Sequence, residues 1–255
     1  MINWEPKIII DLSSENNHFN DLSQGKIPAL IIPKILSEND CQKLSSKIFS
    51  SKVSTGLGIS QKIGESINSY ISNKTQYFKN VKKSNFYLKK ILAPNDPRDI
   101  MLDVISNLFK KNIEFAKEKS ASYSEGIVRL HLSADSIHIH RDKTSFDAPN
   151  FSVSKLTSQM SAILYLQKPE FGGELCIFRK FWSNIDEKFR IPEFGYSNNV
   201  INNVSSSSIT PAQGDLVIIN PNYYHMIKRI KGKLQRISLS FFFGEDVKSN
   251  LFAWS

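Results

Sequence analysis

The chain is poor in the residue types that build several specialised protein classes. Its 255 residues include only 2 cysteines and 10 prolines, and Cys41 and Cys176 are far apart. A disulfide framework and a thiolate metal cluster are therefore excluded. No apolar run approaches the roughly 18–20 residues that cross a bilayer, so no membrane partner is expected. The short isoleucine run near the start is flanked by Glu5 and Asp11 and does not resemble a signal peptide, which predicts a cytoplasmic protein.

Negative charge is also in short supply, with 33 Lys+Arg against 24 Asp+Glu and a formal net charge of +9. A basic balance is typical of proteins that bind nucleic acid or anionic membranes. However, 26 of the cations are lysine and only 7 are arginine, the residue preferred for reading phosphates and bases. The lysines are also scattered along the chain. We therefore expect a solvated basic surface and no nucleic-acid partner.

The first half of the chain carries helix signals. Ser37 is followed three residues later by a carboxylate, a capping-box spacing that predicts a helix through residue 49. The dipeptide Asp96-Pro97 places an N-cap carboxylate before a proline at the first helical position. Apolar residues then recur every four positions, and Ile113 and Phe115 extend them. The pattern predicts one long amphipathic helix that continues past residue 115.

From residue 126 onward the period changes from helical to strand-like. Strands are expected at 127–132, 136–140, 161–166, 174–178, 215–220 and 236–243, with an earlier one at 27–32. The stretches 143–159 and 180–208 are expected to be irregular loops, either of which is a candidate lid, and 221–224 a turn. Many short strands favour a sandwich or barrel. No linker interrupts the chain, so we predict a single domain (1–255) with a mainly helical support layer (1–125), a β-core (126–243) and a tail (244–255).

A metal-binding pattern lies inside the β-rich half. His140 and Asp142 are two residues apart, and such residues share a face of an extended strand. His225 follows 85 residues later, after another expected strand. Two imidazoles and one carboxylate form the facial triad that binds Fe(II) and leaves positions open. Arg236 and Ser238 share a later strand face and together suit the carboxylate of a chelating co-substrate.

These residues also carry a family resemblance. The motifs, in chain order, are His140-Arg141-Asp142, Gly172-Gly173-Glu174-Leu175, Gly214-Asp215-Leu216, His225 and Arg236-Ile237-Ser238. In this order the chain resembles the Fe(II)/2-oxoglutarate-dependent oxygenases, and residues 31–41 resemble the entry to the prolyl-hydroxylase-like branch. The pattern is most similar to the free-standing aliphatic halogenases of indole-alkaloid pathways. The resemblance implies an α+β, mainly β fold with a double-stranded β-helix (jelly-roll) core and flanking N-terminal helices.

The resemblance also implies a set of cofactors and roles. His140, Asp142 and His225 are expected to hold Fe(II), with 2-oxoglutarate as the chelating co-substrate and O2 as the oxidant. Arg236 and Ser238 are expected to pair with the distal carboxylate of 2-oxoglutarate. Tyr165 matches a position that donates its hydroxyl to the same carboxylate in some relatives. A buried core aromatic is an equally good interpretation of Tyr165.

One departure from the halogenases decides the expected reaction. Those enzymes carry a small residue at the position of Asp142, which leaves room for chloride on the metal. A carboxylate there favours hydroxylation, or another oxidation, of an aliphatic C–H in a small, free-standing natural-product or amino-acid-like substrate. Halogenation despite Asp142 and peptidyl or prolyl hydroxylation are the alternatives. A non-enzymic β-barrel binding module is disfavoured because a simple binder needs no such constellation.

Residues near the motifs have more open interpretations. His138 shares a face with His140 and is expected to be a hydrogen-bonded core histidine, with a supporting role at the metal as the alternative. His131 is assigned no function. Arg129 is expected to pair with a substrate carboxylate or with an internal acid. Aromatic loops at 146–151 and 181–196 are candidates to close over a ligand, although ordinary loop packing explains them equally well.

Overall fold

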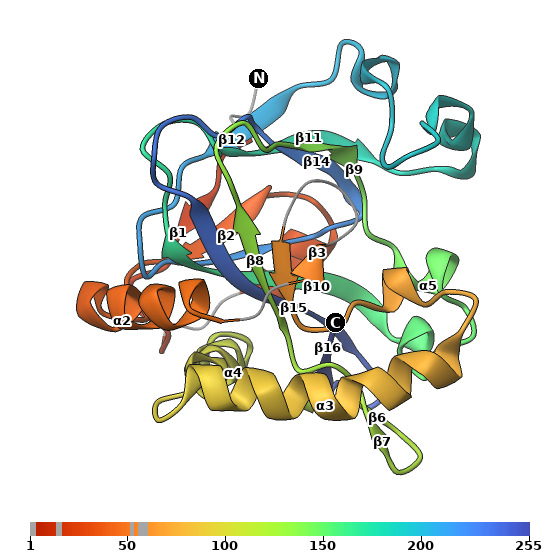
Figure 1. Cartoon of the computed structure of the whole chain (residues 1–255). Helices are drawn as coiled ribbons and strands as arrows, with labels where there is room; N and C mark the ends of the chain where they lie inside the picture. The colour runs from red at the N-terminus through yellow and green to blue at the C-terminus, as the bar shows by residue number, and fades with distance from the viewer. Residues whose placement is uncertain (1–3, 14–16, 52–53, 56–60) are drawn as a thin grey trace.

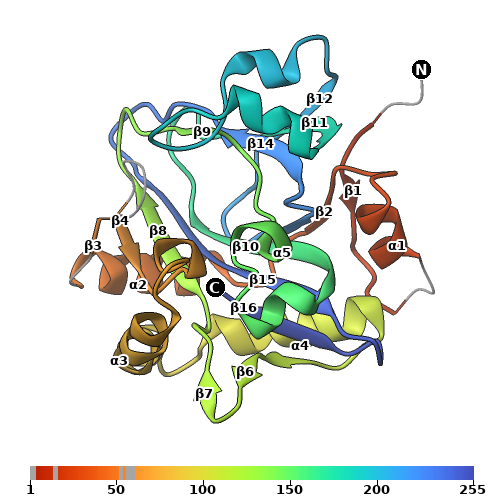
Figure 2. The same ribbon diagram turned by 90° about the vertical axis from the view of Figure 1, so that its right-hand side faces the viewer.

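The structure is a computed structural model of the whole chain, and it describes all residues except 1–3, 14–16, 52–53 and 56–60. Two β-sheets face each other, and helices cover the outer face of the larger sheet (Figure 1). The view at right angles shows the same layers, with the smaller sheet on one side and the helices on the other (Figure 2). This architecture is the mainly β core with flanking helices that the motifs predict.

The larger sheet has ten strands and forms the centre of the molecule. Its order is β1 (Lys7–Ile8), β2 (Ala29–Ile32), β13 (Leu216–Ile219), β10 (Thr157–Gln167), β15 (Arg236–Glu245), β8 (Ile127–His131), β4 (Gln61–Ile63) and β3 (Ser54–Thr55), and β16 (Leu251–Trp254) joins β15 to β5 (Ile113–Phe115). Leu164 of β10 packs toward the helices, whereas its neighbour Tyr165 packs toward the smaller sheet. This part of β10 is therefore apolar on both faces, as expected for a strand between two layers.

The smaller sheet carries residues of the predicted metal site. Its order is β12 (Ser206–Ile209), β11 (Leu175–Phe181), β14 (Tyr223–Ile227) and β9 (Ile137–His140). Ile177 and Ile227 of this sheet pack with Tyr165 and Val217 of the larger sheet in one buried cluster. A separate hairpin pairs β6 (Lys117–Glu118) with β7 (Ala121–Ser122). The apolar cluster between the sheets therefore fixes the distance between their facing inner surfaces.

Two of the helices begin where their capping residues predict. They are α1 (His18–Ser23), α2 (Glu38–Phe49), α3 (Lys74–Leu92), α4 (Pro97–Phe109) and α5 (Thr144–Asp147), with 3-10 turns η1 (Ile67–Ser69), η2 (Ser152–Lys155), η3 (Asn184–Phe189) and η4 (Asn198–Ile201). The Ser37 hydroxyl accepts a hydrogen bond from the Asp40 amide at the start of α2. The Asp96 carboxylate accepts one from the Arg98 amide at the start of α4. Both caps satisfy amides that the helix itself leaves unpaired.

The predicted length of α4 was wrong. The helix ends at Phe109, and Lys110 adopts a left-handed backbone with φ of 54°. Ile113 and Phe115 then alternate with exposed Glu114 in the strand β5, which pairs with β16. These apolar residues fit a period of two as well as a helical period, and the distant partner strand decides between them.

Two other boundaries were also wrong. The strand β12 begins inside the stretch 180–208 that was expected to be irregular, and its residues 206–209 pair with β11. The expected turn at 221–224 is shorter, because Tyr223 begins β14 and His225 lies in the middle of that strand. Both segments are strands because β11 offers them a hydrogen-bonding edge, which the local sequence does not show. The helix α3, 19 residues long, was not predicted at all.

The three-part division of the chain is less sharp than predicted. The segment 1–125 supplies strands β1–β5 to the larger sheet as well as helices, and the tail 244–255 supplies β16. The single-domain organisation stays a prediction. Among the described residues, no helix combines the length and apolarity that crossing a membrane would need.

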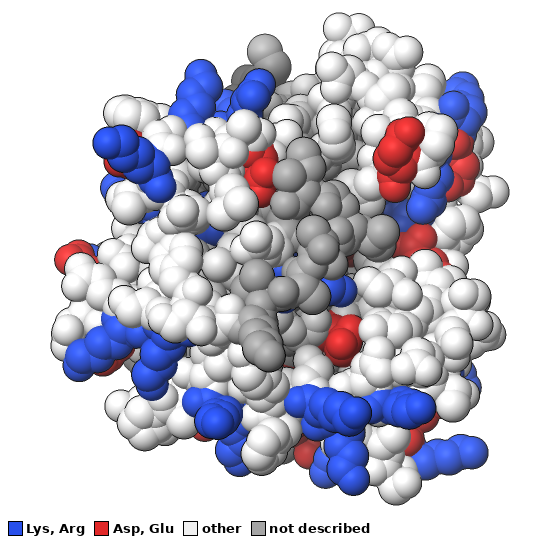
Figure 3. Space-filling view, in the orientation of Figure 1, with Lys and Arg blue, Asp and Glu red and all other residues white. Residues whose placement is uncertain are grey.

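The basic side chains lie largely on the outside, as predicted. Figure 3 shows Lys and Arg spread over the visible face, with a row along its lower edge where α3 lies. The exposed lysines of α3 are Lys79, Lys82, Lys83, Lys89 and Lys90. They project from the face of the helix opposite to buried Tyr77, Val81 and Leu88. The lysine excess on this helix is therefore a solvated surface that accompanies an apolar packing face.

Candidate functional site

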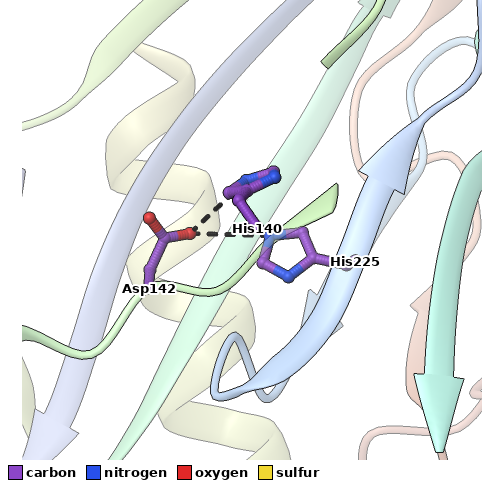
Figure 4. Close-up of side chains that lie close together, drawn as sticks. All are labelled: His140, Asp142 and His225. Atoms are coloured by element: carbon purple, nitrogen blue, oxygen red, sulfur yellow. Dashed lines mark ion pairs between the residues drawn. The ribbon is translucent and has the colours of Figure 1, made fainter. Parts of the chain in front are cut away.

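The structure brings His140, Asp142 and His225 together. His140 ends β9 and lies directly opposite His225 of β14, with ring centroids 4.1 Å apart. Asp142 follows the end of β9, and its amide donates a hydrogen bond to the Pro221 carbonyl at 2.8 Å. One Asp142 oxygen, Oδ2, lies 3.9 Å from Nε2 of His140 and 3.5 Å from Nε2 of His225 (Figure 4). One ligand atom from each residue lies within 4.8 Å of the others.

Backbone carbonyls orient both imidazoles. Nδ1 of His140 lies 2.8 Å from the carbonyl oxygen of His138, and Nδ1 of His225 lies 2.9 Å from that of Tyr223. A carbonyl can only accept, so the proton sits on Nδ1 and the lone pair remains on Nε2. The two Nε2 atoms are the ones that face Asp142. The strand geometry thus presents the nitrogen atoms that a metal requires.

The electrostatics of the cluster also suit a cation. Burial and the neighbouring His225 lower the pKa of His140 to about 4, so this imidazole is neutral near pH 7. Burial alone would raise the pKa of Asp142, but the adjacent His225 and His140 rings lower it to about 2. A neutral imidazole and an ionised carboxylate are the forms that bind metal. The donor set of two nitrogens and one oxygen fits Fe(II).

Arg236 and Ser238 lie on the opposite wall, on the larger sheet. Nη1 of Arg236 donates to the Ser238 hydroxyl at 3.3 Å and lies 3.4 Å from Nδ1 of His131. The Arg236 side chain is 2% exposed, and its Nε has no hydrogen-bond partner. No carboxylate of the described residues lies within ion-pair distance of it. A buried guanidinium with an unused donor fits the carboxylate of an anionic co-substrate.

Tyr165 is both a core aromatic and a neighbour of Arg236. Its ring lies under the Arg236 guanidinium, 4.7 Å from its central carbon, and it packs in the cluster between the sheets. Its hydroxyl is buried and has no hydrogen-bond partner among the described residues. The two interpretations left open by the sequence are therefore compatible, because the ring packs while the hydroxyl remains unused.

The two walls enclose a cavity of about 550 Å³. Its lining includes the three triad residues, Arg236, Ser238 and part of the segment 180–208. From that segment come Ile191, Glu193 and Phe194, and the Phe194 ring lies 5.1 Å from the His140 ring. The segment 143–159 contributes no lining residue among those described. Phe151 from that segment is instead fully buried against Tyr77 and Tyr123.

Sequence reasoning missed the role of Arg141 beside the triad. Its side chain is 2% exposed, forms an ion pair with Asp147 and lies 3.4 Å from Glu187. Its guanidinium also stacks on Trp182, with 4.6 Å between its central carbon and the ring centre, and on Phe146. Arg141 therefore connects the segments 143–159 and 180–208 to the turn that carries Asp142. Nothing in the sequence signals this cluster, because its members are up to 46 residues apart.

The remaining interpretations have mixed outcomes. His138 is exposed at the cavity wall, so the expected core histidine was wrong, because β9 is an edge strand with an open inner face. His131, assigned no function, lies buried beside Arg236. Arg129 lines the cavity and donates to the Ser240 hydroxyl at 2.7 Å, and no described acid pairs with it.

Comparison with known sequences points to the same chemistry. A sequence model of the family described as carrier-protein-independent halogenase WelO5 matches residues 7–255. Leucinostatins biosynthesis cluster protein S of Purpureocillium lilacinum is 29% identical over 183 residues, which are 68% of this chain and 74% of that protein. The L-gamma-glutamyl-L-propargylglycine hydroxylase of Streptantibioticus cattleyicolor is 28% identical over 101 residues, 40% of this chain and 37% of that protein.

Solved structures with the same fold have much lower identity. An N-substituted L-amino acid dioxygenase from Burkholderia ambifaria, in complex with alpha-KG, has a TM-score of 0.63 at 13% identity and covers 93% of this chain and 90% of its own. HygX from Streptomyces hygroscopicus, with nickel and 2-oxoglutarate bound, has a TM-score of 0.55 at 11% identity and covers 91% and 87%. At such identities the likeness shows the fold. Because the family match spans almost the whole chain, the protein belongs to the carrier-protein-independent halogenase WelO5 family, within the Fe(II)/2-oxoglutarate-dependent oxygenase superfamily.

Proposed function

We propose that the protein is a 2-oxoglutarate-dependent dioxygenase that hydroxylates an aliphatic C–H of a free-standing small molecule, either a natural product or an amino-acid derivative. The observation that carries this proposal is Asp142 Oδ2 lying 3.5 Å and 3.9 Å from the two histidine nitrogens. The carboxylate then occupies the metal position that a halide would need. The superfamily membership supports the chemistry, and the hydroxylase relative supports the reaction.

Each residue of the site has a distinct task in this proposal. His140, Asp142 and His225 hold Fe(II) on one face. Arg236 and Ser238 bind the distal carboxylate of 2-oxoglutarate, and the buried Tyr165 hydroxyl is a further donor for it. When bound, iron and 2-oxoglutarate supply the oxidising chemistry with O2. The surrounding cavity orients the substrate and excludes water.

Succinate formation tests the proposal. Purified protein receives Fe(II), 2-oxoglutarate and a panel of natural products and amino-acid derivatives, and succinate and product masses are measured by mass spectrometry. We expect turnover to need both iron and 2-oxoglutarate and to fall at least about a hundredfold in Asp142→Ala and His225→Ala. Asp103→Ala, an exposed carboxylate on α4, is the control and should retain activity. Undiminished turnover in both triad variants contradicts the proposal.

Halogenation is the second candidate, and the family description favours it. The same reactions run with and without chloride separate the two. A product heavier by one oxygen atom under both conditions supports hydroxylation. A chloride-dependent product that has exchanged hydrogen for chlorine supports halogenation, and it means that the metal accepts a halide while Asp142 is present.

A further inference from the structure

A second, half-buried cation faces the cavity from the larger sheet. Arg129 lies on β8, where its register partners are Ser238 of β15 and Lys62 of β4. Directly opposed residues of neighbouring strands share a face, so all three belong to the inner face of the sheet. Arg129 and Lys62 both line the cavity. The cavity therefore holds more positive charge than the single arginine that the distal carboxylate of 2-oxoglutarate uses.

The guanidinium of Arg129 points away from Arg236. Its Nη1 donates to the Ser240 hydroxyl at 2.7 Å, and Ser240 lies four residues along β15 from Arg236. The Arg236 guanidinium contacts Ser238 instead, two residues along β15 from Ser240, and two residues of a strand span about 7 Å. The two guanidinium groups thus contact different hydroxyls of one cavity.

Arg129 has no acid of its own. No carboxylate of the described residues lies within ion-pair distance of its guanidinium, and its hydrogen bond goes to a neutral hydroxyl. Burial, followed by the charge of Arg236, lowers its pKa, and the charge of Asp142 opposes the shift. A half-buried guanidinium without an anion is less stable than one that a carboxylate of a ligand neutralises.

The surroundings of Arg129 are polar. The cavity lining there includes Ser66, Asn68 and Ser69 of the η1 turn, and the Ser69 hydroxyl accepts a hydrogen bond from Lys62 Nζ at 3.2 Å. Hydroxyl and amide groups beside two cations suit a charged ligand better than a hydrocarbon.

We propose that Arg129 is a specificity-determining residue that binds a carboxylate of the substrate, so the enzyme acts on anionic small molecules. This inference rests on the proposed function, in which the metal and Arg236 account for both carboxylates of 2-oxoglutarate. Arg129 and its polar neighbours then remain for the substrate. The metal centre on the facing sheet lies across the same cavity, where it can reach a C–H of a substrate held at Arg129.

Binding without turnover tests the inference. Mn(II) replaces Fe(II), 2-oxoglutarate is added, and calorimetry measures the affinity for a panel of N-acetyl-L-amino acids, each beside its primary carboxamide. We expect at least one acid to bind about ten- to a hundredfold more tightly than its amide. Arg129→Gln should remove that preference, and Arg129→Lys should retain part of it. Arg229→Gln, an exposed arginine outside the cavity, is the matched control and should behave as wild type.

The outcomes separate this inference from the proposed function. A panel in which no acid binds more tightly than its amide, while Mn(II) and 2-oxoglutarate still bind, overturns the inference alone. Weaker 2-oxoglutarate binding in Arg129→Gln also overturns it, because Arg129 then serves the co-substrate. If wild-type protein binds neither Mn(II) nor 2-oxoglutarate, the proposed function fails and the inference fails with it. Unchanged Mn(II) and 2-oxoglutarate binding in Arg129→Gln shows that the variant is folded.

Discussion

At the scale of single residues, the arginines of this protein do different work according to burial. Arg236 is buried and Arg129 half-buried without an acid, whereas Arg141 is buried between two acids and two aromatic rings. In the proposed function a guanidinium without an acid binds an anionic ligand, whereas one with acidic partners stabilises the fold. Lysine-rich exposed surface accounts for most of the remaining charge. The net charge of +9 therefore says less about partners than these three side chains do.

Arg141 provides a stability prediction at this scale. Arg141→Ala should lower the free energy of unfolding by about 3 kcal/mol, because it leaves Asp147 and Glu187 without their buried partner. Arg141→Lys should lower it less, since lysine keeps the positive charge but has no planar guanidinium to stack on Trp182 and Phe146. Chemical denaturation of the metal-free protein measures both.

Arg190 is the matched control, since it pairs with the same Glu187 at 3.2 Å but is 54% exposed. Arg190→Ala should change the free energy of unfolding by less than about 1 kcal/mol. Equal losses in Arg141→Ala and Arg190→Ala would show that burial does not set the strength of this cluster.

At the scale of elements, a single carboxylate joins three segments at the edge of the fold. Glu118 of β6 pairs with Lys74 of α3, accepts a hydrogen bond from the Tyr123 hydroxyl and accepts another from the Ser152 amide at 2.9 Å. Burial alone would raise the pKa of Glu118, but the bonds from Lys74, Tyr123 and Ser152 lower it to about 2. The ionised carboxylate is therefore a stabilising link between α3, the β6–β7 hairpin and the η2 turn.

These contacts of Glu118 predict that the free energy of unfolding depends on pH. The folded-state pKa of Glu118 lies below the ordinary value of 4.5, so its contribution is complete above pH 4.5 and is lost as pH falls toward 2. Glu118→Gln should lower the free energy of unfolding by about 1 kcal/mol at pH 7, after allowance for solvent screening, and by much less at pH 2.5. Glu114→Gln, an exposed glutamate on nearby β5, should change neither value. An equal loss at both pH values in Glu118→Gln contradicts the assigned role.

The helices and strands also show which element boundaries the sequence alone can predict. Ser37 and Asp96 locate the starts of α2 and α4 because an N-cap needs only the residues next to it. The segment 113–115 and the strand β14 were misplaced because their conformations depend on partner strands β16, β11 and β9. Helix starts are local, whereas strands are completed by residues far along the chain.

At the scale of the whole molecule, the proposed ligands connect the two sheets. The triad belongs to the smaller sheet and the turn after β9, whereas Arg236 belongs to the larger sheet. A ligand that binds both walls stabilises their approach and raises the unfolding temperature. We expect Mn(II) and 2-oxoglutarate together, each at about a hundred times its dissociation constant, to raise the melting temperature by more than the sum of the two separate shifts.

Each ligand alone is expected to add about 2.7 kcal/mol to the free energy of unfolding. Thermal denaturation measures the shifts in melting temperature. In His225→Ala the Mn(II) shift should disappear, and in Arg236→Gln the 2-oxoglutarate shift should disappear while the Mn(II) shift remains. Arg229→Gln is again the control. Shifts that persist in both variants would mean that the ligands bind elsewhere.

By itself, the sequence determined the family, the mainly β fold class and the residue types of the triad. Those features depend on motif order, alternating hydrophobicity and the chemistry of His, Asp and Arg, all of which can be read along the chain. It left open the role of Tyr165, the partners of Arg141 and the part that Arg129 plays. The tertiary structure shows the surroundings of these residues, because it sets two sheets face to face and brings together side chains that are far apart in the chain, such as Arg129 and Ser240, which are 111 residues apart. Burial and missing partners, which give a charge its task, exist only once the chain has folded.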